Sequence, residues 1–219
     1  PEKETDIEKQ IQLVENCIID KFDAIVLAAC GAVELNPSII KANKADIPVI
    51  LVNDNIDFEK LEAEGGSYVT YVGIDQEIAA GHAGKYVADN FPDGANVAIL
   101  EGVAGVLAAQ QRKDGFMSQF ANNDKIKVVI SQPANWEREQ GFSVFQNMLT
   151  SNPEINVLYS CNDEMALGAV EAIEQAGLTG KITVLGFDAT DDAKAAIKEG
   201  KMAGSVAQYP SEMGYESVM

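Results

Sequence analysis

The stretch Val157-Leu-Tyr-Ser-Cys-Asn162-Asp163 decides the fold, because a short apolar run ends abruptly at an amide and an acid. Residues 157–161 are typical of a buried strand, and residues 164–176 repeat apolar side chains at helical spacing. A buried strand that leads directly into a helix is the unit of a parallel α/β sheet. The carboxyl ends of such strands line the ligand crevice, so we expect Asn162 to face a ligand. We interpret Asp163 as a helix cap.

The same pattern occurs twice more along the chain. The apolar run 47–52 stops at Asn53 and Asp54, and the run 182–187 stops at Asp188. Carboxylates and amides can each make two hydrogen bonds in fixed geometry, which suits a ligand rich in hydroxyl groups. The pattern therefore indicates binding before it indicates catalysis.

Strand and helix patterns alternate along the whole sequence. We predict α/β architecture, with parallel strands covered by helices on both faces and right-handed crossovers. The expected strands are residues 22–28, 47–52, 68–74, 97–101, 126–131, 157–161, 182–187 and a short one from 204. The expected helices are residues 7–18, 36–43, 76–91, 106–121, 136–150, 164–176 and 191–200, while 53–67 is expected to be a polar connection. From this pattern alone, the strands could form one sheet or two.

Composition excludes several classes of function. A net charge of -18 and a pI near 4.3 argue against nucleic acid as a partner, whose phosphates would be repelled. The acidity is otherwise typical of a soluble protein. No apolar run reaches the length of a membrane span, and no basic-then-apolar signal sequence begins the chain. The three cysteines, Cys17, Cys30 and Cys161, lack metal-ligand spacing and are interpreted as small buried hydrophobic residues.

Residues for catalysis are few. His82 is the only histidine, and it lies among small residues that predict tight helix packing, so no nucleophile–histidine pair is expected. The stretch Glu101-Gly-Val-Ala-Gly105 resembles a phosphate loop but lacks its full pattern, and a tight turn explains it better. We predict that the protein is not an enzyme and holds no cofactor or metal.

Two further residues fit a sugar site. Trp136, the sole tryptophan, offers an indole face to the C–H groups of a sugar ring. Arg112 carries several N–H donors for hydroxyl or ring oxygens. Core packing is the alternative role for Trp136, and a solvated helix face is the alternative for Arg112.

Several segments together resemble the periplasmic sugar-binding proteins of the ribose-binding type, whose fold is shared by the effector domains of LacI-type repressors. The resemblance rests on residues 108–116, 161–168, 185–188 and 206–210, with weaker support from 47–50 and 71–75. It implies two doubly wound parallel-sheet lobes, joined by a hinge, that enclose a sugar. The residues it places on the sugar are Arg112, Trp136, Asn162, Phe187, Asp188 and Gln208, the last at a hinge crossing.

The resemblance also implies boundaries and two departures. We expect residues 1–100 to form an incomplete N-terminal lobe, 101–206 the C-terminal lobe, and 207–219 the hinge return with the next helix of the first lobe. The family's first strand and last segment have no counterpart here, so the chain is expected to be truncated at both ends. Asn53 and Asp54 stand where ribose-type members have Asp-Arg, which exchanges donors for acceptors and argues against ribose itself.

We therefore predict an extracytoplasmic solute-binding protein that delivers a monosaccharide or polyol to an ABC importer. Its expected location is the periplasm, or the surface of a single-membrane bacterium as a lipoprotein. Its expected partners are the permease and a chemoreceptor, with no nucleic acid. The alternative is the effector-binding core of a LacI-type transcription regulator.

Overall fold

The computed structural model describes residues 3 and 5–219, and it divides the chain into two compact units. The first unit comprises the chain up to Ile74, the short segment Gly105–Ala108 and Tyr209–Met219. The second unit comprises Asp75–Ala104 and Ala109–Gln208. Parallel sheets with covering helices confirm the predicted α/β class.

The first unit contains a three-stranded parallel sheet in the order β1-β2-β3. Its core is formed by buried aliphatic side chains from the strands and from the first three helices, Ile39 and Leu51 among them. Its elements are α1 (Ile7–Ile19), β1 (Ile25–Leu27), α2 (Asn36–Lys44), β2 (Val49–Val52), α3 (Phe58–Ala63), β3 (Thr70–Val72) and α9 (Pro210–Glu216).

Helix α3 corrects the expected polar connection at residues 53–67. The Asp57 carboxylate accepts a hydrogen bond from the Lys60 backbone N–H at 3.1 Å, so it caps the first turn. Leu61 is fully buried in the core of this unit and fixes the helix against the sheet. The helix has six residues, too few for a helical repeat to stand out in the sequence.

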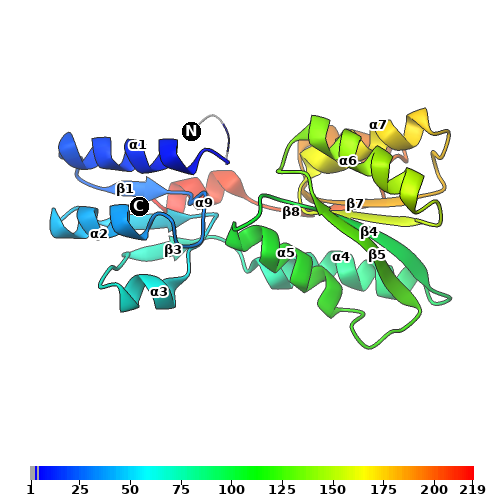
Figure 1. Ribbon diagram of the computed structural model, residues 1–219, viewed down its shortest axis with the longest axis horizontal. Coiled ribbons are helices and arrows are strands. Elements are labelled where there is room, and N and C mark those ends of the chain that lie inside the picture. The colour runs from blue at the N-terminus through cyan, green and yellow to red at the C-terminus, as the bar shows by residue number, and fades with distance from the viewer. Residues whose placement is uncertain (1–2, 4) are drawn as a thin grey trace. The chain divides into compact units, whose positions relative to one another are not determined.

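The second unit contains a five-stranded parallel sheet in the order β5-β4-β6-β7-β8. Helices α6 and α7 cover one face and α4 and α5 the other (Figure 1). This strand order makes the sheet doubly wound, with its topological switch point between β4 and β6. Its elements are α4 (Gln76–Asn90), β4 (Ala95–Glu101), α5 (Leu107–Ser118), β5 (Ile126–Pro133), α6 (Arg138–Ser151), β6 (Val157–Ser160), α7 (Asp163–Gln175), β7 (Thr183–Asp188), α8 (Asp191–Lys198) and β8 (Gly204–Ala207).

The division between the units differs from the expected lobes, 1–100 and 101–206. Asp75–Ala104 belongs to the second unit because β4 lies inside the five-stranded sheet, where Val97 pairs with Val128 on one side and Val157 on the other. The turn after α4 therefore connects elements within one unit and does not mark a boundary. Gln208 is the last residue of the second unit, and the chain returns to the first at Tyr209.

Tight packing holds α4 and α5 on the second sheet. A Cβ added at Gly84 would lie 2.1 Å from the Phe116 carbonyl oxygen, which confirms the close packing expected around His82. The Phe116 ring stacks on the ring of Tyr159, with centroids 4.1 Å apart. Both side chains are fully buried. Helix α5 is thus fixed over β6, which positions the residues it carries.

Candidate ligand-binding site

In the second unit, the carboxyl ends of neighbouring strands place polar and aromatic side chains at one edge of the sheet. Trp136 follows β5, Asn162 follows β6, Asp188 ends β7 and Gln208 follows β8. Their positions at the edge beside the switch point are those where ligands bind in doubly wound sheets. Helix α5 adds Arg112, so the structure brings together six of the eight predicted site residues, the sixth being Phe187.

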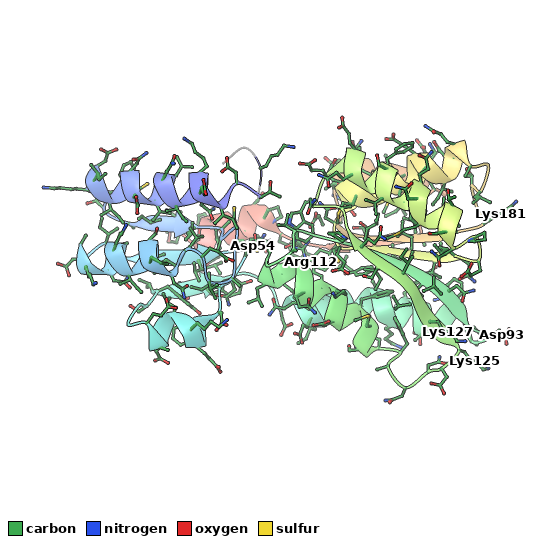
Figure 2. The ribbon with its side chains drawn as sticks, in the orientation of Figure 1. Asp54, Asp93, Arg112, Lys125, Lys127 and Lys181 are labelled. Carbon is green, nitrogen blue, oxygen red and sulfur yellow. The ribbon has the colours of Figure 1, made fainter. Side chains whose placement is uncertain are left out.

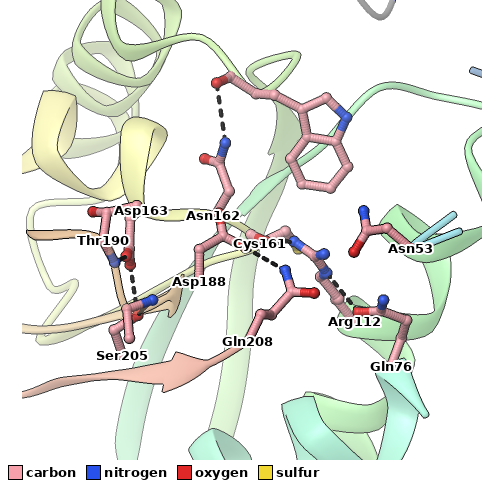
Figure 3. Close-up of polar contacts among 12 residues, drawn as sticks. Asn53, Gln76, Arg112, Cys161, Asn162, Asp163, Asp188, Thr190, Ser205 and Gln208 are labelled. Atoms are coloured by element: carbon pink, nitrogen blue, oxygen red, sulfur yellow. Dashed lines mark hydrogen bonds and ion pairs between the residues drawn. The ribbon is translucent and has the colours of Figure 1, made fainter. Parts of the chain in front are cut away.

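Arg112 is the central cation of this group. The residue is 4% exposed, which contradicts the alternative of a solvated helix face. Its Nε donates to the Gln76 side-chain oxygen at 2.9 Å, and its Nη1 donates to the Cys161 carbonyl oxygen at 2.8 Å (Figure 3). The same Nη1 lies 3.5 Å from a carboxylate oxygen of Asp188. The guanidinium is therefore held in one orientation from three sides.

Asp188 is a carboxylate in a largely desolvated position. Burial raises its pKa to about 6, against the opposing effects of the Arg112 charge and a hydrogen bond from the Gln208 amide. That amide donates to Asp188 Oδ1 at 2.5 Å. The pKa of this carboxyl group lies close to neutral pH because protein donors compensate only part of its desolvation. A ligand with further donors would stabilise its ionised form.

Two aromatic rings flank the Arg112 guanidinium. Its central carbon lies 4.0 Å from the centroid of the Phe187 ring and 5.4 Å from that of Trp136. The indole also lies against Gly102, where an added Cβ would meet its ring atoms at 2.0 Å. Glycine after β4 is thus needed for the ring to occupy this place. The partly exposed indole gives the site an apolar wall beside its charged centre, while the fully buried Phe187 ring packs against the guanidinium.

Asn162 has a double structural task. Its side-chain oxygen accepts from the Met165 N–H at 2.9 Å, and its Nδ2 donates to the Trp136 carbonyl at 3.0 Å. The second bond stabilises Trp136, whose backbone is left-handed with a φ of 66°. The cap of α7 is therefore Asn162, which corrects the assignment of that role to Asp163. Asp163 instead bonds to Ser205 and to the Thr190 backbone.

Two polar atoms of the group have no hydrogen-bond partner in the described part of the chain. They are Nε1 of Trp136, a donor, and Oε1 of Gln208, an acceptor, and both are buried. Buried polar atoms are nearly always paired in folded proteins. One atom needs an acceptor and the other needs a donor. A ligand with hydroxyl groups can satisfy both, because a hydroxyl donates and accepts hydrogen bonds.

The other two predicted residues belong to the first unit, after β2. Asn53 adopts a left-handed φ of 60°, and its Nδ2 donates to the Asp54 carboxylate at 2.8 Å. The Tyr71 hydroxyl donates to the Asn53 carbonyl at 2.8 Å and so secures the turn. These hydrogen bonds therefore fix the conformation of Asn53 and Asp54 at the end of β2.

Sequence reasoning missed Gln76, Ser205 and Gly102. Gln76 is the first residue of α4 and is 2% exposed, yet nothing in its local sequence indicates that it would meet Arg112 on α5. Asp75 stands directly after the expected strand 68–74, so the position that singled out Asn162 does not single out Gln76. The sequence around Gly102, the glycine after β4, predicts only a tight turn.

Three lysines of the second unit lie away from Arg112 (Figure 2), and the Cys161 thiol is inert. Lys125, Lys127 and Lys181 lie at the far end of the sheet from Arg112 (Figure 2). Burial raises the pKa of the Cys161 thiol to about 12, so it remains protonated at neutral pH. Within the described residues, no group of three or more histidine, cysteine or acidic side chains is placed to hold a metal ion. None of the described helices has the length and apolar character to cross a membrane.

The chain belongs to the periplasmic binding protein domain family, whose model matches residues 1–219. This membership confirms the resemblance to sugar-binding proteins of the ribose-binding type. Among curated relatives, the D-allose-binding periplasmic protein of Escherichia coli is 33% identical over 212 residues, covering 96% of this chain and 68% of the relative. The ribose import binding protein RbsB of Salmonella typhimurium is 34% identical over 210 residues, with the same coverage of 96% and 68%.

Solved structures show the same relationship. A periplasmic solute-binding protein of an ABC transporter from Actinobacillus succinogenes, with bound D-allose, matches at a TM-score of 0.90 and 40% identity. The match covers 97% of this chain and 75% of that one. A solute-binding protein from Bacillus halodurans with bound myo-inositol matches at 0.90 and 31% identity, covering 97% and 72%. These relatives are binding proteins rather than enzymes.

Proposed function

We propose that this protein is an extracytoplasmic solute-binding protein that binds a monosaccharide or polyol and delivers it to an ABC importer. The observation that carries the proposal is the group at the strand ends of the second unit. A buried guanidinium flanked by two aromatic rings meets a partly buried carboxylate there. This combination suits a ring that has hydroxyl groups at its edge and C–H bonds on its faces.

Each residue has a defined role in this proposal. Asp188 accepts hydrogen bonds from ligand hydroxyls, and Arg112 donates to ligand oxygens with the N–H groups that its protein acceptors leave available. Trp136 packs on a C–H face of the ring, and its Nε1 donates to a ligand oxygen. The fully buried Phe187 ring instead supports the Arg112 guanidinium. The Gln208 side-chain oxygen accepts from a ligand hydroxyl, which satisfies both unpaired buried atoms.

The first unit supplies Asn53 and Asp54 as further ligand contacts. Its assigned segments adjoin the second unit at Ile74–Asp75, near Ala104–Ala109 and at Gln208–Tyr209. We propose that these crossings act as a hinge that closes on the ligand. An acceptor at Asp54 favours ligands with a hydroxyl to donate there, consistent with D-allose and myo-inositol in the related structures.

The permease of the importer, and a chemoreceptor, are the proposed protein partners. The proposed location is the periplasm, which the periplasmic relatives support, or the surface of a single-membrane bacterium as a lipoprotein. None of the relatives named above is a transcription regulator, so the comparisons give no support to the alternative of a repressor core.

Calorimetric titration of the full-length protein tests the proposal. The panel consists of D-ribose, D-allose, D-fucose, L-arabinose and myo-inositol, with a disaccharide such as sucrose as the control. We expect saturable heat with at least one monosaccharide or polyol and none with the disaccharide. Absence of binding across the whole panel would contradict sugar binding.

A further inference from the structure

Asp163 is a fully buried carboxylate that the proposed ligand contacts do not use. Its Oδ1 accepts from the Ser205 hydroxyl at 2.6 Å, and its Oδ2 accepts from the Thr190 backbone N–H at 2.7 Å. An ionised carboxylate is costly to bury unless its oxygens are hydrogen-bonded. The pairing of both oxygens therefore indicates that the position requires a carboxylate.

These hydrogen bonds join three elements of the second unit. Asp163 begins α7, Thr190 precedes α8 and Ser205 lies in β8 (Figure 3). The Ser205 hydroxyl also accepts from the Ala189 N–H at 2.9 Å. It therefore bridges the Asp163 carboxylate and the turn after β7 by hydrogen bonds. The turn is thereby tied to α7 and to β8 at once.

The turn that receives these bonds has an unfavourable backbone. Asp188 has a φ of 114° and Ala189 a φ of 53°, in the region that favours glycine. Such conformations persist only where the surroundings hold them. Gly186 provides the space, since a Cβ there would lie 2.3 Å from Asp163 Oδ1.

We propose that Asp163, acting through Ser205, is a positioning residue that holds the turn at residues 188–190 so that the Asp188 carboxylate faces the ligand. It also fixes β8, whose next residue is Gln208, so both partners of the short Gln208–Asp188 bond depend on it. This inference rests on the proposed sugar-binding function. The ligand then meets a preorganised carboxylate rather than a mobile one.

Four variants test this role by sugar affinity at pH 8, with circular dichroism and thermal melting to establish that each is folded. Ser205→Ala removes the bridging hydroxyl, and Asp163→Asn removes one acceptor oxygen. We expect both to lose roughly 10-fold or more in affinity for the best sugar of the panel. Ser205→Thr keeps the hydroxyl and should remain within about threefold of the parent.

Asp191→Asn is the matched control. It makes the same chemical change at the start of α8, where the carboxylate is fully exposed and bonded to Lys194, and it should bind like the parent. The proposal is overturned if Ser205→Ala and Asp163→Asn are folded and bind within threefold of the parent. Unfolding of Ser205→Ala would also overturn it, because the hydroxyl would then serve the fold alone. A parent that binds no sugar would instead contradict the proposed function.

Discussion

At the scale of single residues, Asp188 shows how binding and stability oppose each other. Its carboxylate is held in a desolvated place, with Arg112 and Gln208 offsetting only part of the cost, and its pKa is raised to about 6. A binding site must keep such a group available for the ligand. In the unliganded protein the desolvation of this carboxylate therefore lowers stability, and hydrogen bonds from the ligand's hydroxyls offset that loss.

The pH dependence of stability tests this balance. The folded pKa is above the ordinary value of 3.8, so the protonated form is favoured in the folded state. Its contribution to stability is fully present below pH 3.8 and is lost as the pH rises through about 6. Asp188→Asn mimics the protonated form, so its unfolding free energy relative to the parent should rise by ~2 kcal/mol between pH 4 and pH 7.

Urea unfolding of the ligand-free parent and of Asp188→Asn at several pH values measures this difference. Asp191→Asn, which changes an exposed carboxylate nearby, is the control and should show little change over the same interval. A relative stability of Asp188→Asn that stays constant or falls as the pH rises would contradict the account.

Sequence alone identified the residues that directly follow buried strands. Asn162 and Asp188 stood out because a polar side chain ends an apolar run, and the resemblance added Arg112 and Gln208. Gln76 and Asp163 could not be assigned in this way, because their roles depend on partners 36 and 42 residues away along the chain. The place of Asn162 was found, but its task as helix cap was assigned to its neighbour.

At the scale of elements, the connections after β4 and β5 act together. Gly102 leaves the space that the Trp136 indole fills, and Asn162, the N-cap of α7, holds the Trp136 backbone. The aromatic wall of the site is therefore fixed by three separate connections. Because the tryptophan is the only one in the chain, its fluorescence reports on this wall alone.

Gly102→Ala tests the packing of these connections. The new Cβ would meet the indole at 2.0 Å, so the ring must move. We expect a shift in Trp136 emission and a loss of roughly 10-fold in sugar affinity, about 1.4 kcal/mol. Gly204→Ala is the control, since its Cβ would meet its nearest neighbour at an ordinary 3.8 Å. Unchanged emission and affinity in Gly102→Ala would show that the ring does not depend on this glycine.

The order of strands and helices in the second unit was predictable because long apolar strands alternate with helices of full length. The short helix α3 was not, since six residues give little periodicity and Gly65-Gly66 indicate a connection. The boundary expected near residue 100 differs from the division in the structure for another reason. Whether β4 joins one sheet or the other depends on strand pairing, which a run of buried residues does not specify.

At the scale of the whole molecule, the proposed ligand contacts lie at strand ends in both units. The chain is strongly acidic, with a net charge of -18, so a buried guanidinium at the strand ends is a local exception. A neutral polyhydroxylated ligand needs such a local balance of donors and acceptors and is indifferent to the net charge.

Recognition of the ligand by Asp188 is tested by the affinity of Asp188→Ala for the sugar that binds the parent best, measured by calorimetry at pH 8. We expect a loss of ~2–5 kcal/mol, because the variant removes charged acceptors of buried hydrogen bonds. Affinity within about threefold of the parent, roughly 0.6 kcal/mol, would remove Asp188 from the site and contradict the account.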